Sequence, residues 1–278
     1  MVPSHLQIAH EINLPGSTLL LALTGWMDGG DVSTGSVKQL MEGHRVREIA
    51  TIAPDDFYIY NFPGSMEVAA LFRPPVKYED GLVVEHVMPS NTFWVDEKTK
   101  LLFFIGREPN LKWQTFADCI FAMVKQAGVS RIIFMGSFGG SVPHTREPRL
   151  YGSVSDESLK PLLKEFGLRP SDYEGPGSFA SFLLAESRRH GVEMISFVAE
   201  IPSYLQGINP LSIEAITRRL AKALNQPIDL DALREASNLW ESRVTAAVEK
   251  DAELAETIRK LEEQYDNELI ESESAEGT

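Results

Sequence analysis

The most informative segment of the chain is residues 131–146, Arg-Ile-Ile-Phe-Met-Gly-Ser-Phe-Gly-Gly-Ser-Val-Pro-His-Thr-Arg. Its apolar run, 132–135, is rich in β-branched and aromatic side chains and is closed by a glycine-rich turn. A run of this length and composition predicts a buried strand. The turn leads to His144, Thr145 and Arg146. Ligands of open α/β sheets bind beyond the carboxyl ends of the strands, so the pattern also predicts a site here.

The rest of the chain alternates in the same way between buried strands and helices. Further strands are predicted at residues 17–24, 46–52, 81–88, 100–106 and 192–199. Helices are predicted after the first strand, with Asp31 or Ser33 as N-cap, and at residues 111–127, 156–166, 178–190 and 213–224. Residues 53–80, which are rich in proline and aromatics, are predicted to leave the regular core. Strands that alternate with helices indicate βαβ units, and therefore a three-layer α/β/α fold with a mainly parallel sheet.

Composition and charge limit the possible partners. The 278 residues include 26 basic and 40 acidic side chains, for a formal net charge of -14. A surface this negative repels phosphate backbones and anionic lipids, so we expect neither nucleic-acid nor membrane binding. The single cysteine, Cys119, lies in an apolar helical pattern and is expected to be a buried structural thiol in a reducing compartment. The apolar run 19–23 is too short to cross a bilayer, and a cytoplasmic location is expected.

The C-terminal part differs from the α/β core, which we place at residues 1–226. Residues 227–270 are predicted to form a helical extension, and the acidic residues 271–278 a disordered tail. An apolar stripe with spacings of four and three runs along this extension, interrupted by Asp251, and consists of Trp240, Val244, Ala247, Leu254, Ile258, Leu261 and Tyr265. The stripe indicates either a coiled-coil-like interaction helix or an amphipathic helix that lies on its own domain. An exposed stripe of this length favours a homo-oligomer.

Candidate chemistry lies at the predicted strand ends. If the strands are parallel, the loops that carry Asp28, Arg107, Glu108, His144 and Arg146 open on one edge of the sheet, together with the loop after the last strand. His144 has the ordinary pKa suited to moving a proton, and Arg146 has the donor geometry to clamp a carboxylate or phosphate. Each residue also has a structural interpretation. Asp28 can cap the next helix, Arg107 and Glu108 can form a surface ion pair, and His144 and Arg146 can tie the loop down or line a subunit interface.

The familiar catalytic motifs are missing from the sequence. The glycine-rich turn at residues 136–140 has neither the Gly-Lys-Ser/Thr of a phosphate-binding loop nor the Gly-x-Ser-x-Gly order of a nucleophile elbow. The six histidines and Cys119 show no zinc spacing, so no metal site is predicted, and catalytic residues and cofactors stay unassigned. A second glycine-proline turn, residues 173–178, opens a helix. Its amide groups can hold an anion, or Ser178 can simply cap the helix.

These segments together resemble the proteasome assembly chaperone 2 family, in the form found in bacteria and archaea. The similar pieces are Gly-Trp-Met-Asp-Gly-Gly (25–30), Gly-Arg-Glu-Pro (106–109), Gly-Ser-Phe-Gly-Gly (136–140), Val-Pro-His-Thr-Arg (142–146) and Tyr-Glu-Gly-Pro-Gly (173–177). The resemblance covers roughly residues 15–225. It implies a fold of the phosphorylase/hydrolase class and a homo-oligomer, most plausibly a trimer. Some eukaryotic and archaeal members assist proteasome assembly, and others have been labelled possible ATP-grasp enzymes.

The motifs and the strand ends together give one set of ligand-binding candidates. They are Asp28, Gly29, Arg107, Gly139, His144, Thr145, Arg146, Tyr173 and Gly175. The chain departs from the family in two places. It ends Ala-Glu-Gly-Thr rather than in a hydrophobic residue, a tyrosine and one more residue, so docking by the tail is not expected. It also has Pro202-Ser203-Tyr204 where a histidine is expected after the proline, so no second histidine is available.

Two functions follow from these observations. The first is a non-enzymatic, oligomeric assembly or scaffold factor of the proteasome-assembly-chaperone type, with a proteasome-related or other protein as partner. The alternative is an enzyme that acts on a small anionic or nucleoside-like substrate in a pocket at the strand ends.

Overall fold

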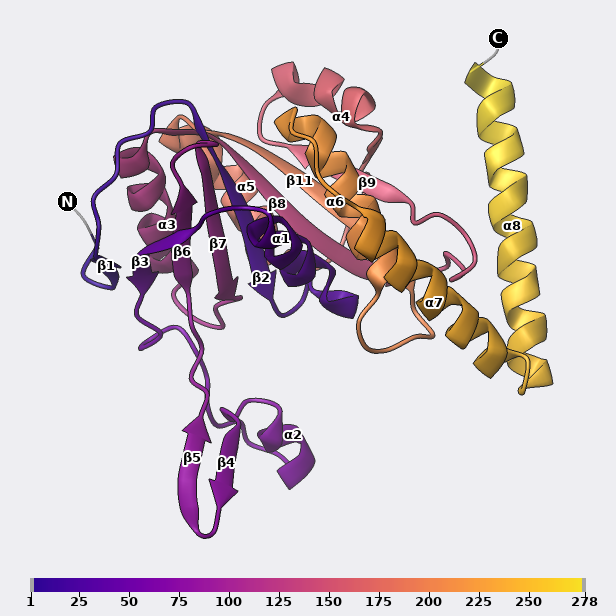
Figure 1. Cartoon of the computed structure of the whole chain (residues 1–278), viewed down its shortest axis with the longest axis horizontal. Helices are drawn as coiled ribbons and strands as arrows, with labels where there is room; N and C mark the ends of the chain where they lie inside the picture. The colour runs from indigo at the N-terminus through magenta and orange to yellow at the C-terminus, as the bar shows by residue number, and fades with distance from the viewer. Residues whose placement is uncertain (1–2, 277–278) are drawn as a thin grey trace.

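One mixed sheet organises the protein. The computed structural model describes residues 3–276, with side chains to residue 271. The strands of this sheet are β1 (Leu6–Ile8), β2 (Ser17–Thr24), β3 (Arg47–Ile52), β6 (Thr92–Asp96), β7 (Leu101–Arg107), β8 (Val129–Gly140), β9 (Leu150–Val154), β10 (Arg169–Pro170) and β11 (Glu193–Pro202). Their order in the sheet is β1-β3-β6-β7-β2-β8-β11-β9-β10 (Figure 1). The four central strands, β7, β2, β8 and β11, are parallel to one another.

The central strands are apolar on both sides because both faces of the sheet are covered. Along β8, Ile132 and Phe134 belong to one hydrophobic core, whereas Ile133 and Met135 belong to the other. The strand β2 divides its leucines between the two cores in the same alternating way. A parallel strand buried on two faces needs a continuous apolar run, which is the pattern that predicted these strands.

Helices form the two outer layers. They are α1 (Val32–Glu42), α3 (Trp113–Ala127), α4 (Lys160–Phe166), α5 (Phe179–Ser187) and α6 (Pro210–Leu224). Helices α3 and α5 pack on one face through Phe116, Ile120 and Leu183. Helices α1, α4 and α6 pack on the other face through Leu40, Leu163 and Ile216. The prediction of a three-layer α/β/α fold is confirmed, and Cys119 is buried on α3 as expected.

The strand predictions needed correction. The short strands β1, β4 (Val76–Glu79), β6, β9 and β10 were missed. Of these, β6 and β9 pair antiparallel with neighbours in the main sheet rather than through a helical crossover. The strand predicted at 81–88 exists, but it does not join the main sheet. It is β5 (Leu82–His86), and it pairs only with β4 in a separate hairpin.

This hairpin is part of an arm that projects from the α/β body. We use the name arm for residues 61–88, which comprise α2 (Met66–Ala70), β4 and β5. Figure 1 shows that the arm lies well away from the sheet. The segment after β3 leads into the arm, and the segment before β6 leads back from it. Every residue of β4 and β5 is exposed on both faces of the hairpin.

The C-terminal extension is a pair of helices rather than one. Helix α7 (Asp231–Val248) ends just before a break at residues 249–251, and α8 (Ala252–Glu276) follows it. Asp251, the polar interruption of the stripe, caps α8 by accepting hydrogen bonds from the backbone amides of Glu253 and Leu254, each at 3.1 Å. The prediction of a continuous seam is therefore wrong. Ile258 and Tyr265 are buried within the chain, as in the second interpretation of the stripe.

The acidic tail also differs from its prediction. Residues 271–276, expected to be disordered, continue α8, and residues 277–278 lie outside the described part of the chain. In Figure 1, α7 and α8 lie at the end of the molecule opposite β1.

Phe116 offers a test of the core that joins α3 to the sheet. Its ring is fully buried and contacts the rings of Phe57, Phe104 and Phe179. We expect Phe116→Ala to lower the free energy of unfolding by about 3–5 kcal/mol, because it leaves a cavity among these rings. Urea denaturation followed by circular dichroism measures the change. Leu239→Ala, at a half-exposed position on α7, is the control and is expected to change stability by less than about 0.5 kcal/mol. Equal effects would contradict this assignment of the core.

Candidate functional site

The loops after the four parallel strands do open on one edge of the sheet, but their side chains separate into two groups. On one side, Trp26, Arg107 and Glu108 line a cavity together with the turn before α5. On the other side, His144, Thr145 and Arg146 face the C-terminal helices. The sequence therefore predicted the correct edge, whereas the single convergent cluster is wrong.

Asp28 supplies side-chain hydrogen bonds to the first turn of α1. Its carboxylate accepts hydrogen bonds from the backbone amide and the hydroxyl of Thr34, at 3.0 and 2.9 Å. Burial raises the pKa of Asp28 to about 6, although the hydrogen bonds from Thr34 oppose the shift. Asp31 occupies the N-cap position of α1, as predicted, but its side chain makes no capping hydrogen bond, and the Asp28 carboxylate supplies the bonds instead. The neighbouring Gly29 accepts a 2.6 Å hydrogen bond at its carbonyl from Ser137, which ties the loop to β8.

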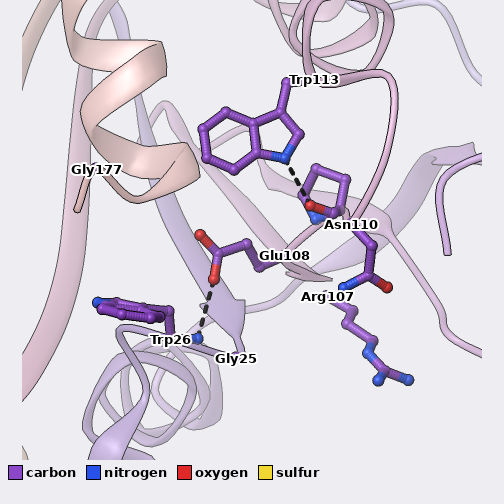
Figure 2. Close-up of a pocket in the computed structure, with 8 residues that line it drawn as sticks. Gly25, Trp26, Arg107, Glu108, Asn110, Trp113 and Gly177 are labelled. Carbon is purple, nitrogen blue, oxygen red and sulfur yellow. Dashed lines mark hydrogen bonds between the residues drawn. The ribbon is translucent and has the colours of Figure 1, made fainter. Parts of the chain in front are cut away.

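Glu108 joins the loops after β2 and β7 to the start of α5. One carboxylate oxygen accepts the amide of Trp26 at 2.9 Å, as Figure 2 shows, and the other accepts the amide of Phe179 at 2.7 Å. The carboxylate therefore pairs with backbone amides rather than with Arg107. The guanidinium of Arg107 lies 5.7 Å from the centre of the Tyr58 ring, in a cation–π contact. The predicted Arg107–Glu108 surface ion pair is wrong.

The cavity beside Glu108 has a volume of about 390 Å³. Its walls include Trp26 and Trp113, and the indole nitrogen of Trp113 donates to the Pro109 carbonyl at 2.8 Å (Figure 2). Sequence reasoning found Arg107 here but missed both tryptophans. The Gly-Trp-Met-Asp motif that contains Trp26 was the signal available for one of them.

His144 is buried and fully hydrogen-bonded within the chain. The Tyr204 hydroxyl lies 2.8 Å from both the backbone nitrogen and Nδ1 of His144, and Nε2 lies 3.1 Å from the Thr245 hydroxyl on α7. Since the Tyr204 oxygen accepts the backbone amide, its own proton is free to donate to Nδ1. We infer that the neutral imidazole carries its hydrogen on Nε2 and donates it to Thr245. Burial lowers the pKa of His144 below its ordinary value, and the charge of Glu262 opposes the shift.

Arg146 holds a carboxylate, as its sequence position predicts, but the carboxylate belongs to this chain. The guanidinium donates from Nε and Nη2 to the two oxygens of Asp266 on α8, both at 2.8 Å. Thr145 donates to Glu262, one turn earlier on the same helix. The Pro-His-Thr-Arg loop is thus occupied by α7 and α8, which matches the structural interpretation in which it ties segments together.

A buried charge cluster that the sequence did not reveal supports this loop. Glu200 on β11 accepts the amides of Ser141 and Val142 at 2.7 and 3.1 Å, and it also accepts Arg149 at 3.2 Å. Arg149 donates at 2.7 Å to Glu268 on α8, and its guanidinium lies 4.5 Å from the centre of the Tyr265 ring. Both Arg149 and Glu200 are buried. One buried arginine therefore connects the sheet, the loop and the C-terminal helix.

The remaining predicted residues are Gly139, Tyr173 and Gly175. Gly139 and Tyr173 line a second, larger cavity of about 880 Å³. The Tyr173 hydroxyl donates to the Pro176 carbonyl at 3.2 Å, and a side chain at Gly175 would collide with the same ring. Gly175 therefore shapes the turn. Within the described residues, no group of three His, Cys, Asp or Glu side chains is placed to hold a metal ion.

The fold and the site define an α/β/α protein whose strand-end loop is covered by its own C-terminal helical pair. None of its described helices combines the length and apolar character needed to cross a membrane. A family model for the PAC2 family matches residues 22–248. The chain belongs to the PAC2 family, as its motifs indicated.

Solved structures agree with this assignment. A protein of unknown function from Mycobacterium tuberculosis is 23% identical, with a TM-score of 0.84 over 99% of this chain and 93% of that one. A proteasome-assembly chaperone homologue from the same organism is 26% identical, with a TM-score of 0.74 over 87% and 99% of the two chains. An archaeal proteasome activator from Pyrococcus furiosus is 18% identical, with a TM-score of 0.64 over 89% and 99%, and shares the fold. The sequence matches none of the curated proteins.

The buried arginine leads to a prediction about stability. We expect Arg149→Met to lower the free energy of unfolding by about 3–5 kcal/mol, because the Glu200 carboxylate keeps its burial and loses its counter-charge. Arg131→Met is a matched control, since Arg131 pairs with Glu193 near the surface, and its loss is expected to cost less than about 1 kcal/mol. Chemical denaturation of both variants measures the difference. Similar costs for the two would show that the cluster does not support the fold.

The state of His144 leads to a prediction about pH. The folded protein holds this imidazole at a lowered pKa, so the unfolded chain binds the proton more readily. Stability from this group is therefore present above pH 6.5 and is lost as the pH falls below it. We expect the gap in unfolding free energy between the wild type and His144→Gln to narrow from pH 7.5 to pH 5. Urea titrations at both values test this, and a gap that stays constant or widens would contradict it.

Proposed function

We propose that this PAC2-family chain acts as a proteasome-assembly-chaperone-like scaffold, which self-associates and binds other protein chains. The observation that carries the proposal is the arm. Its exposed apolar side chains are Phe62, Met66, Val68, Leu71, Val76, Tyr78, Leu82, Val83, Val84, Val87 and Met88. Soluble proteins rarely expose so many contiguous apolar groups unless a partner covers them.

The architecture of the arm supports the same conclusion. A two-stranded hairpin alone in water is marginally stable, because neither of its faces packs against a further layer. Inside the arm, Phe62 and Phe72 stack with their ring centres 5.0 Å apart, yet the hairpin itself has no cover from the α/β body. A neighbouring chain that packs on the arm would supply the missing contacts.

A second copy of this chain is the first partner we propose. Homo-oligomers are the commonest assemblies of soluble proteins, and the family resemblance favours a trimer. The arm replaces the C-terminal stripe as the proposed contact surface, because Ile258 and Tyr265 of that stripe are already buried within the chain.

Proteasome-related proteins are the second class of partner we propose. Support comes from two neighbours, which are described as a proteasome-assembly chaperone homologue and an archaeal proteasome activator. The strand-end loop supports a scaffold over the enzyme alternative, because Asp28, His144 and Arg146 are all engaged by groups of the same chain. A test for this partner is co-elution of the purified chain with the proteasome subunits of its host. Separate elution over a range of concentrations would argue against it.

Charge placed on the arm tests self-association. Met66, Leu71 and Leu82 are 82%, 76% and 71% exposed, so charged side chains there remove little buried surface within the chain. We expect the variant Met66→Glu, Leu71→Lys, Leu82→Lys to be monomeric in native mass spectrometry at concentrations where the wild type is oligomeric. The control, Leu239→Lys on α7, is expected to stay oligomeric. A monomeric wild type at micromolar concentration would refute self-association, and an oligomeric triple variant would place the interface elsewhere.

A further inference from the structure

A cavity of about 880 Å³ is a feature of the described part of the chain that the proposed function does not use. It lies over β8, β11 and β9, on the face of the sheet that α5 covers only in part, and the turn at residues 171–178 closes one side. We call it the sheet groove. Small-molecule sites have volumes of roughly 300–1,000 Å³, so the groove has the size of a ligand site. The candidate ligand-binding residues His144 and Arg146, by contrast, are already hydrogen-bonded to α7 and α8.

The alternation of side chains along the strands builds the floor of the sheet groove. On β11, Ile195, Phe197 and Ala199 point into the core beneath α6, so Ser196 and Val198 face the groove. On the neighbouring strand β9, Tyr151 and Ser153 face the same way. The buried side of β11 is apolar at these three positions, whereas its groove side carries Ser196, whose hydroxyl accepts the Ser153 amide at 3.0 Å. The floor therefore differs from an ordinary core surface that lacks a covering helix.

Aromatic rings and hydroxyls make up most of the rest of the lining. Phe138 is 39% exposed, and its ring centre lies 5.6 Å from that of Tyr151, which gives the floor an aromatic platform. Trp26 and Tyr173 stand at the rim, and further hydroxyls come from Ser171, Ser178 and Ser181. Apolar and aromatic walls with a few placed polar groups are typical of sites for small organic molecules.

Charge decides the class of ligand. Among the residues that the structure describes, no lysine, arginine or histidine lines the sheet groove, and Asp172 is its one carboxylate. The whole chain carries a net charge of -14. A phosphate, nucleotide or carboxylate would find no counter-charge here and would be repelled by the surrounding field. The lining therefore fits an uncharged molecule better than the anionic substrate that the sequence motifs favoured.

We propose that the sheet groove binds an uncharged amphiphile, an apolar body that carries hydroxyl groups. The apolar body packs on Phe138, Tyr151 and Val198, and its hydroxyls bond to serines at the wall and rim. This inference does not depend on the proposed function, because the groove and the arm are separate surfaces.

Two probes whose alkyl chains differ by one carbon test the proposal. Octyl β-D-glucoside is uncharged and carries hydroxyls, whereas octanoate is anionic. Isothermal titration calorimetry on the full chain, below the critical micelle concentration of the glucoside, is expected to show binding of the glucoside at least tenfold tighter than that of octanoate. Equal or tighter binding of octanoate would overturn the ligand class, and binding of neither probe would overturn the site.

A pair of tryptophan variants locates the binding. Ser181 lies on the exposed surface of α5 and lines the groove, so Ser181→Trp is expected to fill it and to abolish binding of the glucoside. Ala185, one turn further along α5, is exposed but does not line the groove, and Ala185→Trp is the matched control that should bind as the wild type does. Melting curves check that both variants fold. Binding that survives Ser181→Trp would overturn the proposal. Binding that appears only after the arm is deleted would also overturn it, because that result would mean that the arm of a second copy fills the groove of the full chain.

Discussion

The buried carboxylate of Glu200 is the constraint on which the strand-end loop depends. Burying a charge is unfavourable unless it is paired and hydrogen-bonded, and Glu200 meets this demand with the amides of Ser141 and Val142 and with Arg149. The strand β8 passes so close that a side chain at Gly140 would overlap the carboxylate. Residue 140 must therefore be glycine as long as Glu200 occupies this position. Together the two residues determine the direction that the loop takes after β8.

The order of the loop residues then determines how the C-terminal helices attach. Once Glu200 holds residues 141 and 142, the following residues meet α7 and α8 in sequence. His144 contacts Thr245, Arg146 contacts Asp266, and Arg149 contacts Glu268. Arg146 pairs with Glu262 and Asp266, which lie on successive turns of α8, and Arg149 pairs with Glu268 on the same helix. The loop that was predicted to bind a ligand instead binds α7 and α8 of the same chain.

Much of the fold was predictable from the sequence because its signals are local. The central strands are apolar on both faces, and the glycine-rich turns mark their ends, so the sequence showed that the loops after these parallel strands open on one edge of the sheet. The strands β6 and β9 were not predictable in the same way, because their stability comes from pairing with distant neighbours rather than from their own composition. The break at Asp251 was visible as an interruption of the stripe. The spacing of apolar residues alone does not distinguish an aspartate that caps a new helix from a polar residue within one continuous helix.

The candidate site was harder to predict, since its meaning lies in partners that are remote in the sequence. Arg146 and Asp266 are 120 residues apart, and Glu200 and Ser141 are 59 apart. A motif shows that a residue type is suited to bind a carboxylate, but it does not show whose carboxylate. With those polar groups satisfied inside the chain, the surfaces still able to gain from a partner are the apolar arm and the sheet groove. Both are recognised by exposed apolar area rather than by ionisable groups, and such surfaces have no short sequence motif. Binding at either proposed surface would therefore be driven mainly by the burial of apolar area.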